Sequence, residues 1–142
     1  MTFSKEVFSA NSCMESGELV IAGCKATLLA KEFETPLFVL DEADFRSRAS
    51  SWKGALHRHF GDNAGEVYYA AKSFICVEVA KMVKESGIGI DVCTGGELAV
   101  ALAADFPTDR IELHGNNKSL SEIEEAIKVG VSRIVVDSIQ EI

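Results

Sequence analysis

Lys72 is the residue of this sequence that is best placed to do covalent chemistry. It comes directly after the apolar run 67–71 (VYYAA). A lysine ammonium buried at the end of such a run would lose hydration energy, and this loss favours the neutral, nucleophilic amine. A nucleophilic amine suits Schiff-base chemistry with a carbonyl compound. The alternative is a lysine at a strand end that extends its ammonium into solvent.

Three further apolar runs lead into polar or glycine-rich segments, which are 91–97 (DVCTGGE), 114–118 (HGNNK) and 137–138 (DS). In parallel α/β proteins the active site lies at the carboxyl ends of the strands. We therefore expect Lys72, Asp91, His114 and Asn116 to share one rim. Each also has an ordinary structural interpretation: a strand-end carboxylate for Asp91, a hydrogen-bonded structural histidine for His114. Glu97 could equally be a first-turn glutamate that interacts with a helix dipole.

The elements that must position these residues alternate along the chain. Strands are predicted at 67–71, 88–93, 111–113 and 133–137, and helices with apolar stripes lie between them. Ser119 and Glu122 form a predicted capping box for one of these helices. Such alternation predicts an α/β fold with a parallel sheet. Units of about 20 to 25 residues suit a (β/α)8 barrel, which needs roughly 250 residues, so only a truncated barrel of four units with a bare last strand fits here.

Before these units the pattern is less regular. Residues 1–34 are predicted to form an irregular segment with a short strand or hairpin at 14–24 and a helical turn at 28–33. Residues 1–16 are polar and are predicted to be irregular. The run 37–40 (LFVL) is predicted to be a buried strand. Residues 35–142 are predicted to form a partial barrel domain.

A helix is predicted after Asp41, which is a good N-cap, and before the turn-rich segment 61–65. Its apolar residues should form one buried stripe; they are Phe45, Ala49, Trp52, Leu56 and Phe60. His57 and His59 point to different sides of this helix, so they cannot both bind one metal, and we predict no metal site.

Composition limits the kinds of partner. The net charge is −8 and the sequence pI is about 4.9, which argues against nucleic-acid binding. No apolar run is long enough for a membrane span, and residues 1–6 do not resemble a signal peptide, so a cytoplasmic protein is expected. The four cysteines form no C-x-x-C pair and are expected to be reduced; Cys93 is expected to be a small buried hydrophobe.

Four motifs carry a family resemblance: 35–41 (TPLFVLD), 69–72 (YAAK), 90–98 (IDVCTGGEL) and 113–119 (LHGNNKS). Together they resemble the first half of a diaminopimelate decarboxylase, a pyridoxal-phosphate enzyme of the alanine-racemase-like barrel group. The similarity runs from about residue 28 to residue 142. The resemblance implies the N-terminal half of a pyridoxal-phosphate-binding TIM-type barrel.

The resemblance also implies roles for these residues. Lys72 would form the Schiff base with pyridoxal phosphate, Asp91 and Glu97 would support the cofactor, and His114 and Asn116 would lie on the same rim. The enzyme would convert the amino acid meso-diaminopimelate to L-lysine and CO₂ and would be a homodimer. Other parts of the site come from the second half of such enzymes, so the 142 residues alone are expected to be inactive.

Two alternatives stay open. The first is a pyridoxal-phosphate-dependent decarboxylase of another basic amino acid, such as ornithine or arginine, because the residues that read the far end of the substrate lie beyond residue 142. The second is a non-catalytic homologue that binds the cofactor. The presence of Lys72 argues against the second, since loss of this lysine is the simplest route to inactivity.

Overall fold

The computed structural model describes residues 7–62 and 65–142. The chain divides into two compact units, Met1–Arg48 and Ala49–Ile142. Among the described residues, no helix combines the length and the apolar content that crossing a membrane requires.

The first unit contains an antiparallel meander, β1 (Ser12–Glu15), β2 (Glu18–Ile21) and β3 (Cys24–Lys25), followed by α1 (Ala26–Phe33). Ser16 and Gly17 connect β1 to β2, and both have positive φ, as the favoured two-residue hairpin turn requires. The predicted hairpin and helical turn are confirmed. The prediction that residues 1–16 are irregular was wrong for β1, because its polar residues pair with β2 through the backbone.

The segment 37–40 does not form the predicted buried strand. It joins neither of the sheets formed by the described residues, and the side chain of Phe38 is 87% exposed. An apolar run forms a strand only where a second strand accepts its backbone hydrogen bonds. The residues of the run do not show whether such a second strand lies beside it.

The predicted long helix is α2 (Glu42–Phe60). Asp41 Oδ1 accepts a hydrogen bond from Asp44 N at 3.1 Å, which confirms the N-cap, and Gly61 follows the helix with a φ of 84°. The predicted buried stripe was wrong. Only Ala49 is buried in α2, and Trp52 is 70% exposed. Helical spacing aligns apolar side chains, but burial needs a second element to cover them.

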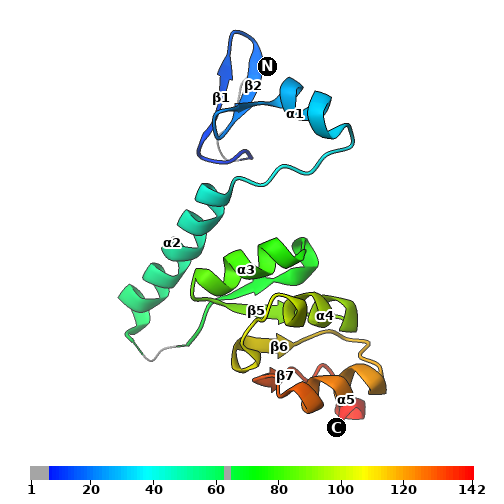
Figure 1. The fold of residues 1–142 in the computed structure, drawn as a ribbon. Helices are drawn as coiled ribbons and strands as arrows, with labels where there is room; N and C mark the ends of the chain where they lie inside the picture. The colour runs from blue at the N-terminus through cyan, green and yellow to red at the C-terminus, as the bar shows by residue number, and fades with distance from the viewer. Residues whose placement is uncertain (1–6, 63–64) are drawn as a thin grey trace. The chain divides into compact units, whose positions relative to one another are not determined.

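The second unit contains a four-stranded parallel sheet in the order β4-β5-β6-β7. The strands are β4 (Tyr68–Ala70), β5 (Gly89–Val92), β6 (Ile111–Leu113) and β7 (Arg133–Ile134). The helices α3 (Val77–Glu85), α4 (Gly95–Ala103) and α5 (Leu120–Val129) connect them, as Figure 1 shows. Three short 3-10 helices complete the unit: η1 (Ala71–Ser73), η2 (Thr108–Arg110) and η3 (Ile139–Glu141). The predicted α/β fold with a parallel sheet is confirmed.

One face of this sheet forms the core. Alternate residues on β5 and β6 point to this face and are fully buried: Ile90, Val92, Ile111 and Leu113. They are buried together with apolar residues of the connecting helices, of which α3 and α4 pack against β5. Burial of each such side chain contributes about 1.5–3 kcal/mol. The helices therefore hold the strands, and the loops at their ends, in fixed register.

The opposite face is polar. Asp91, Glu112 and Arg133 are neighbours in the register of β5, β6 and β7, and Arg133 Nη1 lies 3.7 Å from Glu112 Oε2. On the same face the ring of Tyr68 lies against Gly89, where a Cβ atom would collide with it, and 5.5 Å from the Arg133 guanidinium. Because β4 and β7 are the two outer strands of the sheet, this contact shows that the sheet curves toward its polar face.

Candidate active site

Lys72 lies in η1, the turn that directly follows β4. Two hydroxyl groups brace this turn. Tyr69 Oη donates to Phe74 O at 2.6 Å, and Ser73 Oγ lies within hydrogen-bond distance of both Ala70 O and Tyr69 Oη. Lys72 itself is exposed, so of the two interpretations of its ammonium the structure agrees with the one in which it extends into solvent. The reason is that β4 is an outer strand of the sheet and its end opens directly to the rim.

A hollow of about 520 Å³ lies at the carboxyl ends of the four parallel strands. It is lined by Lys72, Cys93, Thr94, His114, Gly115, Asn116, Asn117 and Asp137. The structure therefore brings together three of the predicted site residues, Lys72, His114 and Asn116. The volume falls within the range of about 300–1,000 Å³ that is usual for small-molecule sites.

Asp91 lies close to this hollow without lining it. Its carboxylate is buried, and its Oδ2 lies 3.5 Å from His114 Nδ1. Its Oδ1 finds no hydrogen-bond partner among the described residues. Nearly all buried polar atoms in proteins have a partner, so this oxygen marks a place where a bound polar group would be stabilised.

Glu97 does not line the hollow, and its carboxylate binds the backbone. Its Oε2 accepts a hydrogen bond from Cys93 N at 2.7 Å, while Thr94 Oγ1 accepts one from Glu97 N at 3.1 Å. These bonds cap the N-terminus of α4. The geometry thus favours the first-turn interpretation of Glu97 over direct contact with a ligand.

Cys93 is only half-buried and lines the hollow. Burial, together with the carboxylates of Asp91 and Glu97, raises the pKa of its thiol. A raised pKa keeps the thiol protonated at neutral pH, and the thiolate is the nucleophilic form. The side chain that was expected to be a small buried hydrophobe is therefore only half-buried, and its thiol is kept in the less nucleophilic form.

Glu122 connects two helices at the rim. Its Oε1 accepts from Gly95 N at 2.8 Å, and its Oε2 accepts from Ser119 N at 2.8 Å, which completes the predicted capping box. The Gly95 and Ser119 amides lower the pKa of Glu122 to about 2. The bond to Gly95 was not foreseeable, because it joins residues 27 positions apart.

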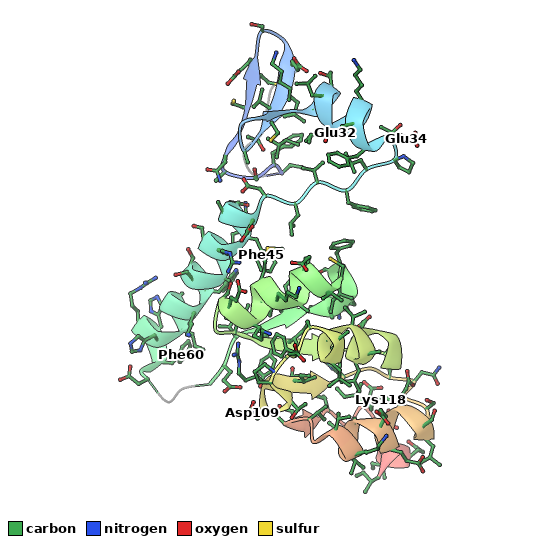
Figure 2. The ribbon with its side chains drawn as sticks, in the orientation of Figure 1. Glu32, Glu34, Phe45, Phe60, Asp109 and Lys118 are labelled. Atoms are coloured by element: carbon green, nitrogen blue, oxygen red, sulfur yellow. The ribbon has the colours of Figure 1, made fainter. Side chains whose placement is uncertain are left out.

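Lys118 lies in the polar segment 114–118, but the burial of its side chain was not predicted. Its side chain is 1% exposed and makes an ion pair with Glu141 at 3.0 Å (Figure 2 marks its position). A lysine in a polar segment before a helix resembles an ordinary surface residue. The only signal for its burial is the distant Glu141, which the sequence does not connect to it.

The comparisons with known proteins agree with this geometry. The family model described as "Pyridoxal-dependent decarboxylase, pyridoxal binding domain" matches residues 42–142. The chain belongs to this family. This chain is 58% identical over 128 residues to the diaminopimelate decarboxylase of Mycobacterium bovis and 43% identical over 131 residues to that of Bacillus subtilis. Each alignment covers 90% of this chain, but only 28% and 29% of the respective relative.

Solved structures show the same fold. A diaminopimelate decarboxylase from M. jannaschii superposes with a TM-score of 0.80 at 28% identity, over 94% of this chain and 31% of that one. Its complex with L-lysine gives a TM-score of 0.77 at 27% identity, with the same coverage. The prediction that the chain forms the N-terminal part of a pyridoxal-phosphate-binding barrel is confirmed.

The cofactor of this family is pyridoxal phosphate, as predicted, and the residues of the hollow fit it. Lys72 offers an accessible amine for the aldehyde, and His114 and Asn116 offer polar groups on the same rim. The buried Asp91 Oδ1 lacks a donor among the described residues. An amine with polar groups beside it suits a polar aromatic aldehyde.

Proposed function

We propose that this chain supplies the lysine-bearing part of a diaminopimelate decarboxylase, which converts meso-diaminopimelate to L-lysine and CO₂ with pyridoxal phosphate as cofactor. The observation that carries the proposal is the placement of Lys72, His114 and Asn116 around one hollow at the carboxyl ends of the parallel strands. The relative from M. bovis supports the choice of substrate by its name and its 58% identity.

Pyridoxal phosphate, when bound, supplies an aldehyde for imine formation and an aromatic ring that stabilises negative charge on the substrate carbon. Lys72 provides the amine, which reacts in its neutral form and which the braced η1 turn presents at the rim. His114 and Asn116 orient polar groups of the bound molecule. Asp91, 3.5 Å from His114 Nδ1, favours the tautomer with a proton on that nitrogen.

Other features of the working enzyme are part of this proposal. The chain spans less than a third of the length of the curated relatives, so we propose that residues 1–142 alone are inactive and that the longer protein acts as a homodimer. We also propose a cytoplasmic location. Three of the four cysteines are exposed, which is compatible with a reducing compartment.

The test is a comparison of substrates with the full-length protein loaded with pyridoxal phosphate. We expect CO₂ release from meso-diaminopimelate to exceed that from ornithine and arginine by at least about a hundredfold, as a site with matched polar contacts allows. A preference for ornithine or arginine would contradict the substrate assignment. Binding of the cofactor with no CO₂ release from any of the three would instead favour a non-catalytic homologue.

The role of Lys72 has its own test. Lys72→Ala should remove the visible absorbance of the cofactor imine and abolish turnover, because no other group supplies the amine. Lys128→Ala, which removes an exposed lysine of α5, should change neither. Turnover by Lys72→Ala at the rate of the Lys128→Ala control would refute the assignment.

A further inference from the structure

We propose that Lys118 is a positioning residue that locks together the two loops facing Lys72, so that His114, Asn116 and Asp137 keep the geometry of a cofactor site. The proposal rests on the proposed function and adds a residue to it. Lys118 itself does not line the hollow. It acts through the backbone and through Glu141.

The ammonium of Lys118 has an acceptor for each of its three hydrogens. Its Nζ lies 2.5 Å from Gly115 O, 2.9 Å from Val135 O and 3.0 Å from Glu141 Oε2. Gly115 belongs to the loop between β6 and α5, whereas Val135 directly follows β7. One cation therefore holds the loop after β6 against the end of the neighbouring strand.

Glu141 extends this connection to a second lining residue. Its Oε2 accepts from Asp137 N at 2.9 Å as well as from Lys118 Nζ. The Asp137 amide and Lys118 lower the pKa of Glu141, so it is ionised at neutral pH. Lys118 and Glu141 thereby fix the backbone at two residues that line the hollow, Gly115 and Asp137.

Stability alone is a weak explanation for this arrangement. A buried ion pair loses hydration energy, which its attraction offsets only where further hydrogen bonds satisfy the charged groups, and apolar replacements are often as stable. By contrast, the ion pair between Lys128 and Glu125, both on α5, is exposed and joins residues only three positions apart. The Lys118 network differs because it joins two separate loops and ends at the lining of the hollow.

Gly115 shows that the loop is held in an unusual conformation. Its φ is 117°, and an added Cβ atom would lie 3.3 Å from Cys93 O. Glycine adopts this conformation without strain, and its missing side chain permits the close approach to Cys93 O. The bond from Lys118 to Gly115 O holds the loop at this approach.

The experiment uses Lys118→Met in the full-length protein, which keeps the length of the side chain and removes its charge and donors. Hydrogen exchange should become about tenfold faster, or more, at the amides of residues 115–117 and 137, and the dissociation constant for pyridoxal phosphate should rise by a similar factor. Exchange at the amides of β4 should stay unchanged. Glu141→Gln, which keeps one acceptor oxygen, should have an intermediate effect.

Two control variants separate positioning from general destabilisation. Lys128→Met makes the same substitution at the exposed pair and should change neither readout. Val79→Ala removes buried volume from α3 and should lower the unfolding temperature without weakening cofactor binding. If Lys118→Met weakens binding no more than Val79→Ala at equal loss of unfolding temperature, the residue is merely structural and the proposal is overturned.

Failure of the proposed function would give a different combination of binding and exchange results. If the unmodified full-length protein binds no pyridoxal phosphate, that function is refuted, but the exchange measurement still decides about Lys118. Accelerated exchange confined to 115–117 and 137 would then support the positioning role. Unchanged exchange there in Lys118→Met would overturn it.

Discussion

The two faces of the parallel sheet differ in almost every physical respect. The face that includes Ile90 and Leu113 is dry, apolar and covered by helices. The face that includes Asp91, Glu112 and Arg133 is charged, and it contains a buried carboxylate oxygen without a partner among the described residues. Both faces are built from the same few strand residues, which alternate between them.

This difference means that one face of the sheet stabilises the fold while the other face carries the polar groups that can do chemistry. The apolar face fixes the register of the strands, and this register determines where the loops at their carboxyl ends lie. The polar face and the rim can then keep groups that stabilise nothing by themselves, such as Asp91 Oδ1. Substitutions on the two faces should therefore have effects of opposite sign or of very different size.

The largest effect is expected from the apolar face. Leu113→Ala should lower the free energy of unfolding by about 2–5 kcal/mol, because Leu113 is fully buried and the substitution leaves a cavity. Urea denaturation of the full-length protein measures this change. A loss below about 1 kcal/mol would mean that the helices do not pack tightly on this face.

A smaller effect is expected from Glu122 at the rim. Glu122→Ala should lower the free energy of unfolding by about 0.5–2 kcal/mol, the usual range for loss of a helix cap. Since the folded pKa is about 2 and the ordinary value is 4.5, the stabilisation is complete above pH 4.5 and declines as the pH falls toward 2. The difference in the free energy of unfolding between the unmodified protein and Glu122→Ala should thus become smaller in acid.

Denaturation at several pH values checks this dependence. Glu124→Ala, on the exposed side of α5, serves as the control and should have little effect at any pH. An effect of Glu122→Ala that stays constant between pH 6 and about pH 2 would show that its carboxylate charge is not what stabilises the helix ends.

The smallest effect, opposite in sign, is expected from the polar face. Burial first, and the nearby Asp91 second, raise the pKa of Glu112. A raised folded pKa means that ionised Glu112 opposes folding above pH 4.5, and that protonation in acid relieves this. Glu112→Gln should therefore stabilise the protein by less than about 1 kcal/mol at pH 7 and have almost no effect near pH 4. A loss of stability at pH 7 would show that the pair with Arg133 outweighs burial.

The sequence predicted the parts of the fold that depend on local patterns. The strands of the second unit follow from apolar runs bounded by turn residues, and the cap at Asp41 and the box at Ser119 follow from side chains that bond within three residues. The rim position of Lys72, His114 and Asn116 follows from strand ends in a parallel sheet. These features need no knowledge of distant partners.

The failures all concern contacts between distant residues. The segment 37–40 and Trp52 are apolar, but their burial depends on what covers them. The exposure of Lys72, which the sequence left open, depends on β4 being an outer strand. Lys118 is separated by 23 positions from Glu141, its only charged partner among the described contacts. No local pattern encodes such pairs.

The ring of Tyr68 lies where a side chain at position 89 would have to be. A side chain at position 89 and the ring at position 68 would occupy the same space, so substitutions at these two positions must occur together. A homologue with a larger residue at position 89 should carry a small residue at position 68, and would give up the stacking on Arg133 that links the outer strands. Covariation between positions 68 and 89 is thus a signature of sheet curvature that can be sought in sequences without any structure.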